Sequence, residues 1–426
     1  GNWESDETLT LRIDTVDPST MLSTAGTAGD SGWWVSPVDV TLTASDATSG
    51  VDEAQYRVDG GSWQAYSGPF TVSAEGAHNV EYRSVDVAGN VESAGDRTIR
   101  IDTVDPDTTA TPSGTAGNAG WWISPVDVTL AANDATSGVD GTEYRVDSGA
   151  WEAYGSPFAV SGEGDHTVGY RSTDVAGNVE TEGTLSLRID TVDPETVSRL
   201  YGTPGNAGWW RSAVYVALDA DDATSGVSET EIDVDGGGWA AYVAPVLVGG
   251  QGDHTADYRS TDVAGNVEIS SSVAFRIDSV APRTTAALTG TLGDNGWYTT
   301  PVAVSLGAVD PSPGSGVDQV FLDDQAATGP AQYEDGVHDL TYHATDVAGN
   351  VEADRALDLK VDTVPPAASV TGGTFCPSCG EVIVLQPEAS DATSGVATWE
   401  LRLLDGDTVV EEWSGDGRPG PRSWNG

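Results

Sequence analysis

The sequence predicts an all-β protein built of tandem β-sandwich domains in an extended row, and three observations support this prediction. A six-residue linker recurs along the chain, the segments between linkers alternate apolar and polar residues, and no segment has a convincing helical period. The chain has 426 residues, which is too long for one small domain. We therefore expect several similar domains in series.

The linker IDTVDP begins at Ile13 and returns at Ile101 and Ile189, at a spacing of 88 residues. It returns in altered form as IDSVAP at Ile277 and as VDTVPP at Val361. The linkers predict a terminal strand of a preceding domain at 1–12, four complete repeats at 13–100, 101–188, 189–276 and 277–360, and a partial fifth domain at 361–426.

Each repeat has the pattern of short, half-buried strands. In Val38–Thr43, apolar residues alternate with Asp and Thr, which predicts a strand with one buried face. Turn sequences such as Asp59–Gly61 separate the strands, and about seven strands per repeat fit a β-sandwich. Aromatic residues are expected to supply much of the core or to cover its edges; in the first repeat these are Trp33, Trp34, Tyr56, Trp63 and Tyr82.

Acidic residues dominate the charge of the chain. The 67 acidic and 18 basic residues give a formal net charge of −49, which argues against nucleic acid and anionic membranes as partners. No apolar stretch approaches the ~18 residues of a membrane helix, so no membrane insertion is expected in this segment. Cations, divalent ones above all, would relieve the repulsion between like charges.

The only two cysteines are Cys376 and Cys379. They could close a small disulfide loop outside the cell, whereas a zinc site would need two further ligands nearby. The four complete repeats must therefore be stable without disulfides.

The motif order GWW, PVDVTL, DATSGV, YRVDGG and DVAGNVE resembles the bacterial Ig-like repeats of large extracellular surface and adhesin proteins. The resemblance covers residues 13–366, and it implies tandem Ig-like sandwiches in an extracellular stalk, often with calcium near the domain junctions. The segment Trp399–Gly426 resembles the first half of the Ig-like module of the flagellar hook-capping protein. Both ends of the chain have the pattern of incomplete domains, which predicts a piece of a longer protein.

In an Ig-like sandwich, the incoming linker, the DATSG loop and the DVAGN loop would meet at one end. In the first repeat they would bring together Asp14, Asp17, Asp46, Asp86 and Asn90. No Lys or Arg stands in these loops to neutralise the carboxylates, so repulsion would raise some of their pKa values or spread the loops. Calcium is the expected cofactor, because it accepts six to eight oxygen ligands in irregular geometry.

The same set recurs in the other repeats. The second and third repeats carry Asp102, Asp105, Asp134, Asp174 and Asn178, and then Asp190, Asp193, Asp222, Asp262 and Asn266. The fourth repeat carries Asp278, Asp310, Asp346 and Asn350, with Ala281 in place of the second linker aspartate, so calcium affinity is expected to be lower there. The fifth junction has only Asp362 and Asp391.

An alternative interpretation is that these Asp and Asn residues only form Asx turns, while Gly89 and Asn90 supply positive φ angles in the hairpin. Both interpretations can hold together. A shared linker aspartate favours calcium, because a turn alone does not require it.

No pattern of a catalytic site is present in the sequence. The repeated histidines are expected to be residues near strand starts without a catalytic role, and no GxSxG motif is found; they are His78, His166, His254 and His338. The sequence therefore predicts a non-enzymatic spacer or stalk, extracellular or on the cell surface, whose junctions calcium stiffens.

The expected partners are neighbouring Ig-like domains of the same chain. Three alternatives remain open at this point. Exposed GWW tryptophans could make the repeats glycan- or protein-binding adhesin modules, with a surface receptor or glycan as partner. The chain could be an accessory region of a secreted enzyme. A filament could also form if Thr8–Asp14 completes the C-terminal domain of another copy by strand donation.

Overall fold

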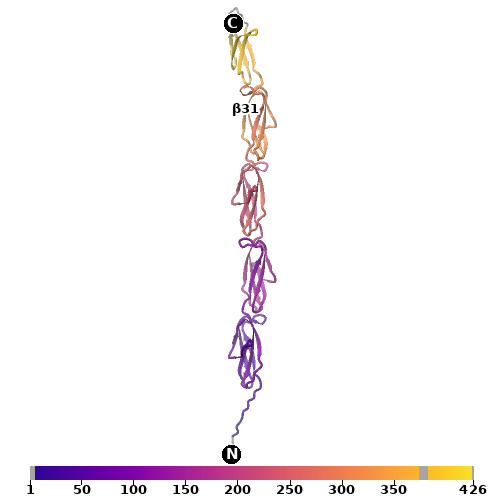
Figure 1. Ribbon diagram of the computed structural model, residues 1–426, viewed down its shortest axis with the longest axis vertical. Helices are drawn as coiled ribbons and strands as arrows, with labels where there is room; N and C mark the ends of the chain where they lie inside the picture. The colour runs from indigo at the N-terminus through magenta and orange to yellow at the C-terminus, as the bar shows by residue number, and fades with distance from the viewer. Residues whose placement is uncertain (1–4, 374–381, 425–426) are drawn as a thin grey trace, which may run out of the picture. The chain divides into compact units, whose positions relative to one another are not determined.

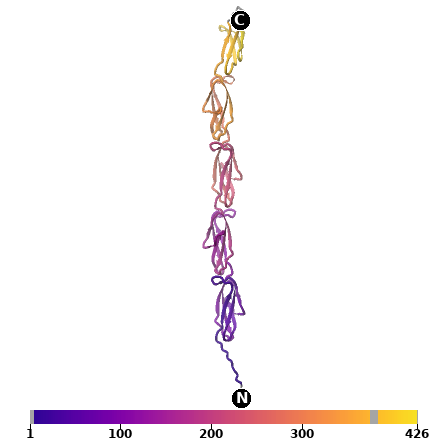
Figure 2. The same cartoon turned by 180° about the vertical axis from the view of Figure 1, so that it is seen from behind.

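The structure, a computed structural model, describes residues 5–373 and 382–424. Cys376 and Cys379, with the predicted disulfide, lie outside the described residues. The chain divides into two compact units. The first consists of Gly1–Glu195, Asp221–Ser228 and Ser260–Glu268, and the second of Thr196–Ala220, Glu229–Arg259 and Ile269–Gly426. Figure 1 and Figure 2 show, from opposite sides, that the strands gather into separate sandwiches, each formed by one stretch of the sequence.

The first sandwich consists of two sheets. One sheet has the order β1 (Ser19–Ala25), β3 (Val38–Ser45) and β6 (Phe70–Val72). The other has the order β2 (Trp33–Trp34), β8 (Gly95–Ile101), β7 (Gly76–Asp86), β4 (Val51–Val58) and β5 (Gln64–Ala65). Neighbouring strands are antiparallel, except that β2 runs parallel to β8. The predicted all-β, Ig-like sandwich architecture is confirmed.

The next three sandwiches repeat this plan. In the second, β9 (Asp107–Ser113), β10 (Val126–Asn133) and β13 (Phe158–Val160) face β11 (Val139–Val146), β12 (Glu152–Ala153), β14 (Gly164–Asp174) and β15 (Gly183–Ile189). The third contains β16 (Glu195–Tyr201), β17 (Trp209–Trp210), β18 (Val214–Asp221), β19 (Val227–Val234), β20 (Ala240–Ala241), β21 (Val246–Val248), β22 (Gly252–Asp262) and β23 (Ser271–Ile277). The fourth contains β24 (Arg283–Thr289), the short 3-10 helix η1 (Asp294–Gly296), β25 (Trp297–Tyr298), β26 (Val302–Val309), β27 (Val317–Leu322), β28 (Gln325–Ala326), β29 (Ala331–Tyr333), β30 (Gly336–Asp346) and β31 (Arg355–Val361).

The last part of the described chain forms two smaller sheets. One contains β32 (Ala367–Thr371), β33 (Ile383–Ser390) and β36 (Arg422–Trp424), and the other contains β34 (Thr398–Asp405) and β35 (Thr408–Asp416). The predicted first residues of the second and third repeats, Ile101 and Ile189, are the last residues of β8 and β15.

The terminal strand predicted at 1–12 is not formed over the described residues 5–12. A strand needs a neighbour for its backbone hydrogen bonds, and this segment pairs with no described strand. Its apolar side chains are exposed: Leu9 by 93%, and Leu11 by 74%.

Aliphatic residues, not aromatic ones, form the centre of the first core. Val38, Val40 and Ile101 are fully buried there, because every second residue of a strand faces the opposite sheet. Trp34, Tyr56 and Tyr82 pack partly buried against this centre, and Trp63 lies outside it beneath the guanidinium groups of two arginines. Of the two places expected for the aromatic residues, the core or its edges, Trp34, Tyr56 and Tyr82 take the edges and Trp63 takes neither.

A buried hydroxyl pair ties the two sheets together. In the second sandwich, the hydroxyl of Thr108 lies 2.7 Å from that of Ser172 and donates to Glu180 Oε2 at 2.6 Å. The fourth sandwich has Ala344 at the position of Ser172, and the buried hydroxyl of Thr284 has no partner there. An unpartnered buried hydroxyl lowers stability by the cost of its lost hydration.

Replacing Ala344 by serine is therefore expected to stabilise the fourth sandwich by about 1 kcal/mol, because the new hydroxyl restores one buried hydrogen bond. Hydrogen exchange of β30 in the full chain measures this change. Thr284→Val, which removes the unpartnered hydroxyl instead, should also stabilise it. A loss of stability in both variants would contradict this account.

Candidate metal centre at the N-terminal end of each sandwich

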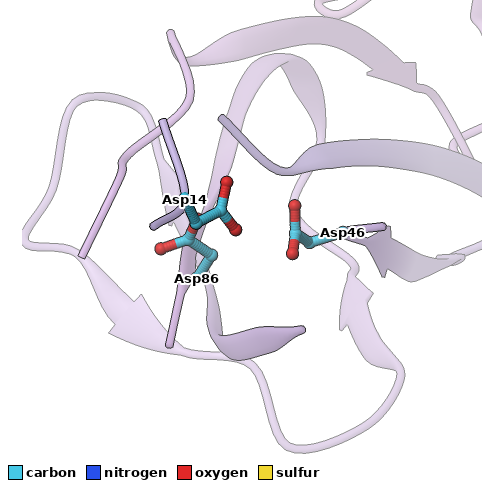
Figure 3. A group of neighbouring side chains, drawn as sticks. All are labelled: Asp14, Asp46 and Asp86. Atoms are coloured by element: carbon cyan, nitrogen blue, oxygen red, sulfur yellow. The ribbon is translucent and has the colours of Figure 1, made fainter. Parts of the chain in front are cut away.

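Three carboxylates meet where the linker enters the first sandwich. Asp14 comes from the linker, Asp46 from the loop after β3, and Asp86 from the end of β7, and Figure 3 shows them converging from these separate segments. One oxygen of each carboxylate lies within 4.8 Å of the others. The predicted convergence of linker, DATSG loop and DVAGN loop is therefore present in the structure.

The same group recurs in the next three sandwiches, and each group lies within one of the two compact units. The linker and hairpin aspartates of these groups are at most 2% exposed. The groups are Asp102, Asp134 and Asp174, then Asp190, Asp222 and Asp262, and then Asp278, Asp310 and Asp346.

The second linker aspartates are not part of these groups. Asp17, Asp105 and Asp193 are exposed, and none is among the grouped carboxylates. In the first linker the backbone turns directly after Asp14, where the N–H of Val16 donates to Asp14 Oδ1 at 3.0 Å. Asp17 follows this turn and so lies away from the group.

The hairpin asparagines connect the hairpin to the linker through their amide nitrogens. Nδ2 of Asn178 donates to the carbonyl of Asp102 at 3.0 Å and to Asp174 Oδ2 at 2.7 Å. The same two contacts recur for Asn90, Asn266 and Asn350. These hydrogen bonds therefore connect the hairpin carboxylates to the linker.

Backbone N–H groups also satisfy the loop aspartates. Oδ1 of Asp46 accepts hydrogen bonds from Thr48 at 3.1 Å, from Ser49 at 2.7 Å and from Gly50 at 2.7 Å. The hydrogen bond from Gly50 is the largest of the influences that lower the pKa of Asp46. The Asx-turn geometry predicted as the alternative is thus present, together with the carboxylate group.

Ser49 is a site residue that the sequence reasoning missed. Its N–H donates both to Asp46 Oδ1 and, at 2.8 Å, to Asp14 Oδ2, so one backbone group connects the loop to the linker. Ser137 makes the same pair of contacts with Asp134 and Asp102. The recurrence of serine at the fourth position of DATSG was the available signal.

Burial and hydrogen bonding act in opposite directions on the hairpin aspartate of the first group. Burial is the largest single influence on Asp86 and raises its pKa. The hydrogen bonds from Asn90, Ser49 and Gly89 together outweigh it, so that the pKa of Asp86 lies below its ordinary value. This carboxylate is therefore held ionised within the group.

The fourth group differs in its loop. DPSPGSG, which begins at Asp310, replaces DATSG, and prolines lack the N–H groups that the other loops donate. Oδ2 of Asp310 accepts from Gly316 at 2.6 Å, but its buried Oδ1 has no partner. Burial, and then the charges of Asp278 and Asp346, raise the pKa of Asp310.

The reason for expecting lower calcium affinity in the fourth group does not hold. Ala281 replaces a linker aspartate whose equivalents lie outside the other groups, so this replacement removes no grouped carboxylate. At the fifth junction, the N–H of Ser394 connects Asp362 and Asp391, and no third carboxylate of the described residues joins them.

The tryptophans predicted as a glycan platform are half-buried, and several stack with arginine. The guanidinium of Arg188 lies 5.6 Å from the ring centre of Trp121, and that of Arg276 lies 5.0 Å from Trp209. Trp63, which is not part of a GWW motif, has the guanidinium of Arg83 4.1 Å from its ring centre. These rings already have cation-π partners within the chain.

The repeated histidines lie near strand starts, as predicted. Nδ1 of His78 lies 2.8 Å from Asp59 Oδ2, and His166 and His254 have the same kind of partner. Nε2 of His338 lies 2.8 Å from the carbonyl of Glu334, and the other three histidines make the same contact with the residue four positions earlier. These contacts connect neighbouring strands and turns.

The hydrogen bond to Asp59 raises the pKa of His78, and the same bond lowers the pKa of Asp59. The stabilisation from His78 is lost as the pH rises through its raised pKa, and that from Asp59 is lost as the pH falls through its lowered pKa. His78→Gln should therefore lower stability by up to ~1 kcal/mol near pH 5.5 and by much less at pH 8. Unfolding of the full chain at both pH values measures this, with His338→Gln as the control. Equal losses at both pH values would contradict the charge pairing.

Comparison with known proteins supports no family assignment. No protein-family model matches the chain, and no curated protein matches it either. Among solved structures, the ICAM-5 D1–D4 ectodomain fragment covers 80% of this chain and 100% of its own, at 13% identity and a TM-score of 0.34.

A solved chain from a structural study of a 1.5-MDa bacterial ice-binding adhesin matches 62% of this chain over 99% of its own length, at 14% identity and a TM-score of 0.27. The fibronectin(III)-like modules of Clostridium thermocellum CbhA cover 40% of this chain and 95% of their own, at 14% identity and a TM-score of 0.21. Scores this low assign neither a family nor a function, and the resemblance to the hook-capping module stays a prediction. Among the described residues, no helix is long and apolar enough to span a membrane.

Proposed function

We propose that this chain is a non-enzymatic spacer in a larger extracellular or cell-surface protein, and that calcium stiffens its junctions. The observation that carries the proposal is the fixation of each linker. Asp102 is 0% exposed, its Oδ2 accepts the N–H of Ser137 at 3.0 Å, and its carbonyl accepts Asn178. A linker bonded to two loops of the sandwich that it enters has little freedom as a hinge.

The carboxylate groups fit a calcium ion. Two oxygens bound to one calcium at 2.3–2.6 Å can be no more than about 5 Å apart. The grouped oxygens, which lie within 4.8 Å of one another, meet this limit. Calcium would neutralise part of the charge and hold linker, loop and hairpin together. The buried, unpartnered Oδ1 of Asp310 also supports a cation in the fourth group.

Calcium binding and its mechanical effect can be measured on the full chain. We expect calorimetric titration of the calcium-free protein with calcium to show calcium-binding sites. The variant Asp134→Asn should have one site fewer, because asparagine keeps the turn acceptor but removes the charge. Small-angle scattering should give a longer maximum dimension with calcium than with a chelator. An unchanged dimension would contradict stiffening by calcium, and an absence of binding would contradict the metal sites.

A second candidate function is a filament subunit joined by strand donation, and the exposure of residues 5–13 favours it. Residues 8–18 match residues 184–194 at all positions but one. In the second sandwich Leu187 and Ile189 of this sequence are buried, whereas Leu11 and Ile13 are exposed. Sedimentation of the full chain tests the idea, because association between copies should disappear in Leu9→Asp/Leu11→Asp. A chain that is monomeric at all concentrations would exclude it.

A further inference from the structure

The loop before the GWW motif leaves one backbone donor unused inside its own sandwich. In the first sandwich, Gly29 N–H donates to the carbonyl of Trp33 at 3.0 Å, and Trp33 N–H donates to that of Asp30 at 2.9 Å. The positive φ angles of Ser31 (49°) and Gly32 (78°) make this a tight turn of the type I′ kind. The N–H of Asp30 takes no part in this pairing.

That N–H is used by the next sandwich. Asp30 N–H donates at 2.8 Å to the carbonyl of Ala176, in the DVAGN hairpin that follows β14. The same bond runs from Asn118 to Ala264 at 2.7 Å and from Asn206 to Ala348 at 2.9 Å. Each of these bonds joins residues of a single compact unit.

The burial of the hairpin alanines agrees with this contact. Ala176, Ala264 and Ala348 are 0% exposed, whereas Ala88, at the same position of the first hairpin, is exposed. The same hairpin sequence is therefore covered only where the loop of a preceding sandwich contacts it.

The contact requires glycine before the donating residue. A Cβ atom on Gly29 would lie 2.2 Å from the carbonyl oxygen of Ala176, and those on Gly117 and Gly205 would lie 2.3 and 2.5 Å from the corresponding oxygens. None of these three glycines has a positive φ angle, so the turn itself does not require them. The close approach of the next sandwich is what excludes a side chain.

We propose that the Gly-Asx pair of this loop and the DVAGN hairpin form a specific docking interface between consecutive sandwiches. The partner that fits the hairpin is the Gly-Asx turn of another module of this type, because only a glycine lets a backbone N–H approach the alanine carbonyl. This interface fixes the orientation of neighbouring modules without calcium. If this interface contributes to the stiffness of the chain, that role rests on the proposed spacer function.

The fourth sandwich provides a natural comparison. Its loop repeats the sequence at Gly293 and Asp294, and Gly293 N–H again donates to the carbonyl of Trp297, at 2.8 Å. No hairpin carbonyl among the described residues accepts the N–H of Asp294. A Cβ atom on Gly293 would meet only atoms of its own loop and strand, the nearest being Cγ2 of Thr299 at 2.8 Å.

The test uses the full chain with Cys376→Ser and Cys379→Ser and with spin labels at two exposed strand positions, Thr43→Cys and Ala131→Cys. Pulsed electron spin resonance measures the distance distribution between the first two sandwiches, with calcium and with a chelator. Gly29→Ala should broaden the distribution about twofold in both conditions, because domains without a fixed interface move relative to each other. An unchanged width in both conditions would overturn the interface.

A second variant distinguishes a clash with the carbonyl of Ala176 from a clash within the loop itself. The Cβ of Gly29→Ala would also lie 2.7 Å from Cγ1 of Val35. Gly29→Ala/Val35→Ala removes that contact and should stay as broad as Gly29→Ala, while Val35→Ala alone should keep the original width. Recovery of the narrow distribution in the double variant would overturn the proposal.

Hydrogen exchange gives an independent readout on the unsubstituted chain. The amides of Asp30, Asn118 and Asn206 should exchange about tenfold more slowly than that of Asp294, since only the first three donate to a hairpin carbonyl. Equal exchange at all four would overturn the interface. That outcome would not change the expected effect of calcium on the maximum dimension from small-angle scattering. The docking interface and the stiffening by calcium can therefore be contradicted independently of each other.

Discussion

Replacing Ile189 by alanine should destabilise the second sandwich by about 2–5 kcal/mol, because it empties a fully buried position of the core. Ile189 is 0% exposed and ends β15. Ile13→Ala, in the identical sequence RIDTVDP, should change stability by no more than ~0.5 kcal/mol, because Ile13 is 70% exposed. Hydrogen exchange of β10 and β14 in the full chain measures the first effect locally.

The comparison of the two isoleucines separates burial from local sequence. A large loss of stability from Ile13→Ala would show that Ile13 is buried in solution, against the structure. A loss below about 1 kcal/mol from Ile189→Ala would show that the second core closes over the cavity.

Removing the carboxylate of Asp134 is expected to destabilise the second sandwich by about 2–4 kcal/mol, with or without calcium. Its Oδ1 accepts three backbone N–H groups, from Thr136 at 3.1 Å, Ser137 at 2.9 Å and Gly138 at 2.6 Å. Asp134→Ala leaves all three donors in the loop without this acceptor. Denaturant unfolding of the full chain, followed by hydrogen exchange of residues 133–139, measures the loss.

Asp134→Asn is the matched variant, because the amide oxygen can still accept from the turn while the charge is gone. In a chelator it should retain most of the stability that Asp134→Ala loses, whereas the stabilisation of the second sandwich by added calcium should disappear. If Asp134→Ala were as stable as the original chain in a chelator, the Asx turn would contribute nothing. If Asp134→Asn kept the full response to calcium, Asp134 would not be a ligand.

The sequence was sufficient for most of the candidate site because the site repeats with the linker. Recurrence at a constant spacing marked Asp14, Asp46 and Asp86 as a set, and the topology of the sandwich brings their three segments to one end. Periodicity could not separate Asp14 from Asp17, since both recur equally well. The turn at Val16 decides which of the two lies in the group.

Side-chain identity also left the role of the asparagines and tryptophans open. The sequence placed Asn90 among the metal ligands, and the structure adds that its Nδ2 donates to the carbonyl of Asp14 and to Asp86. Trp63 was expected in the core or at its edge, and the positions of Arg57 and Arg83 decide that it stacks with guanidinium groups instead.

The sequence alone determined the all-β class, the repeated modules and the carboxylate set, because alternation of apolar residues and regular recurrence are properties of the chain itself. Only the tertiary structure decided the environment of identical sequences. RIDTVDP is buried at Ile189 and exposed at Ile13, and DVAGN is covered at Ala176 and exposed at Ala88. The physical reason is that burial depends on which neighbouring strand or loop contacts a residue, and such contacts join segments far apart in the chain.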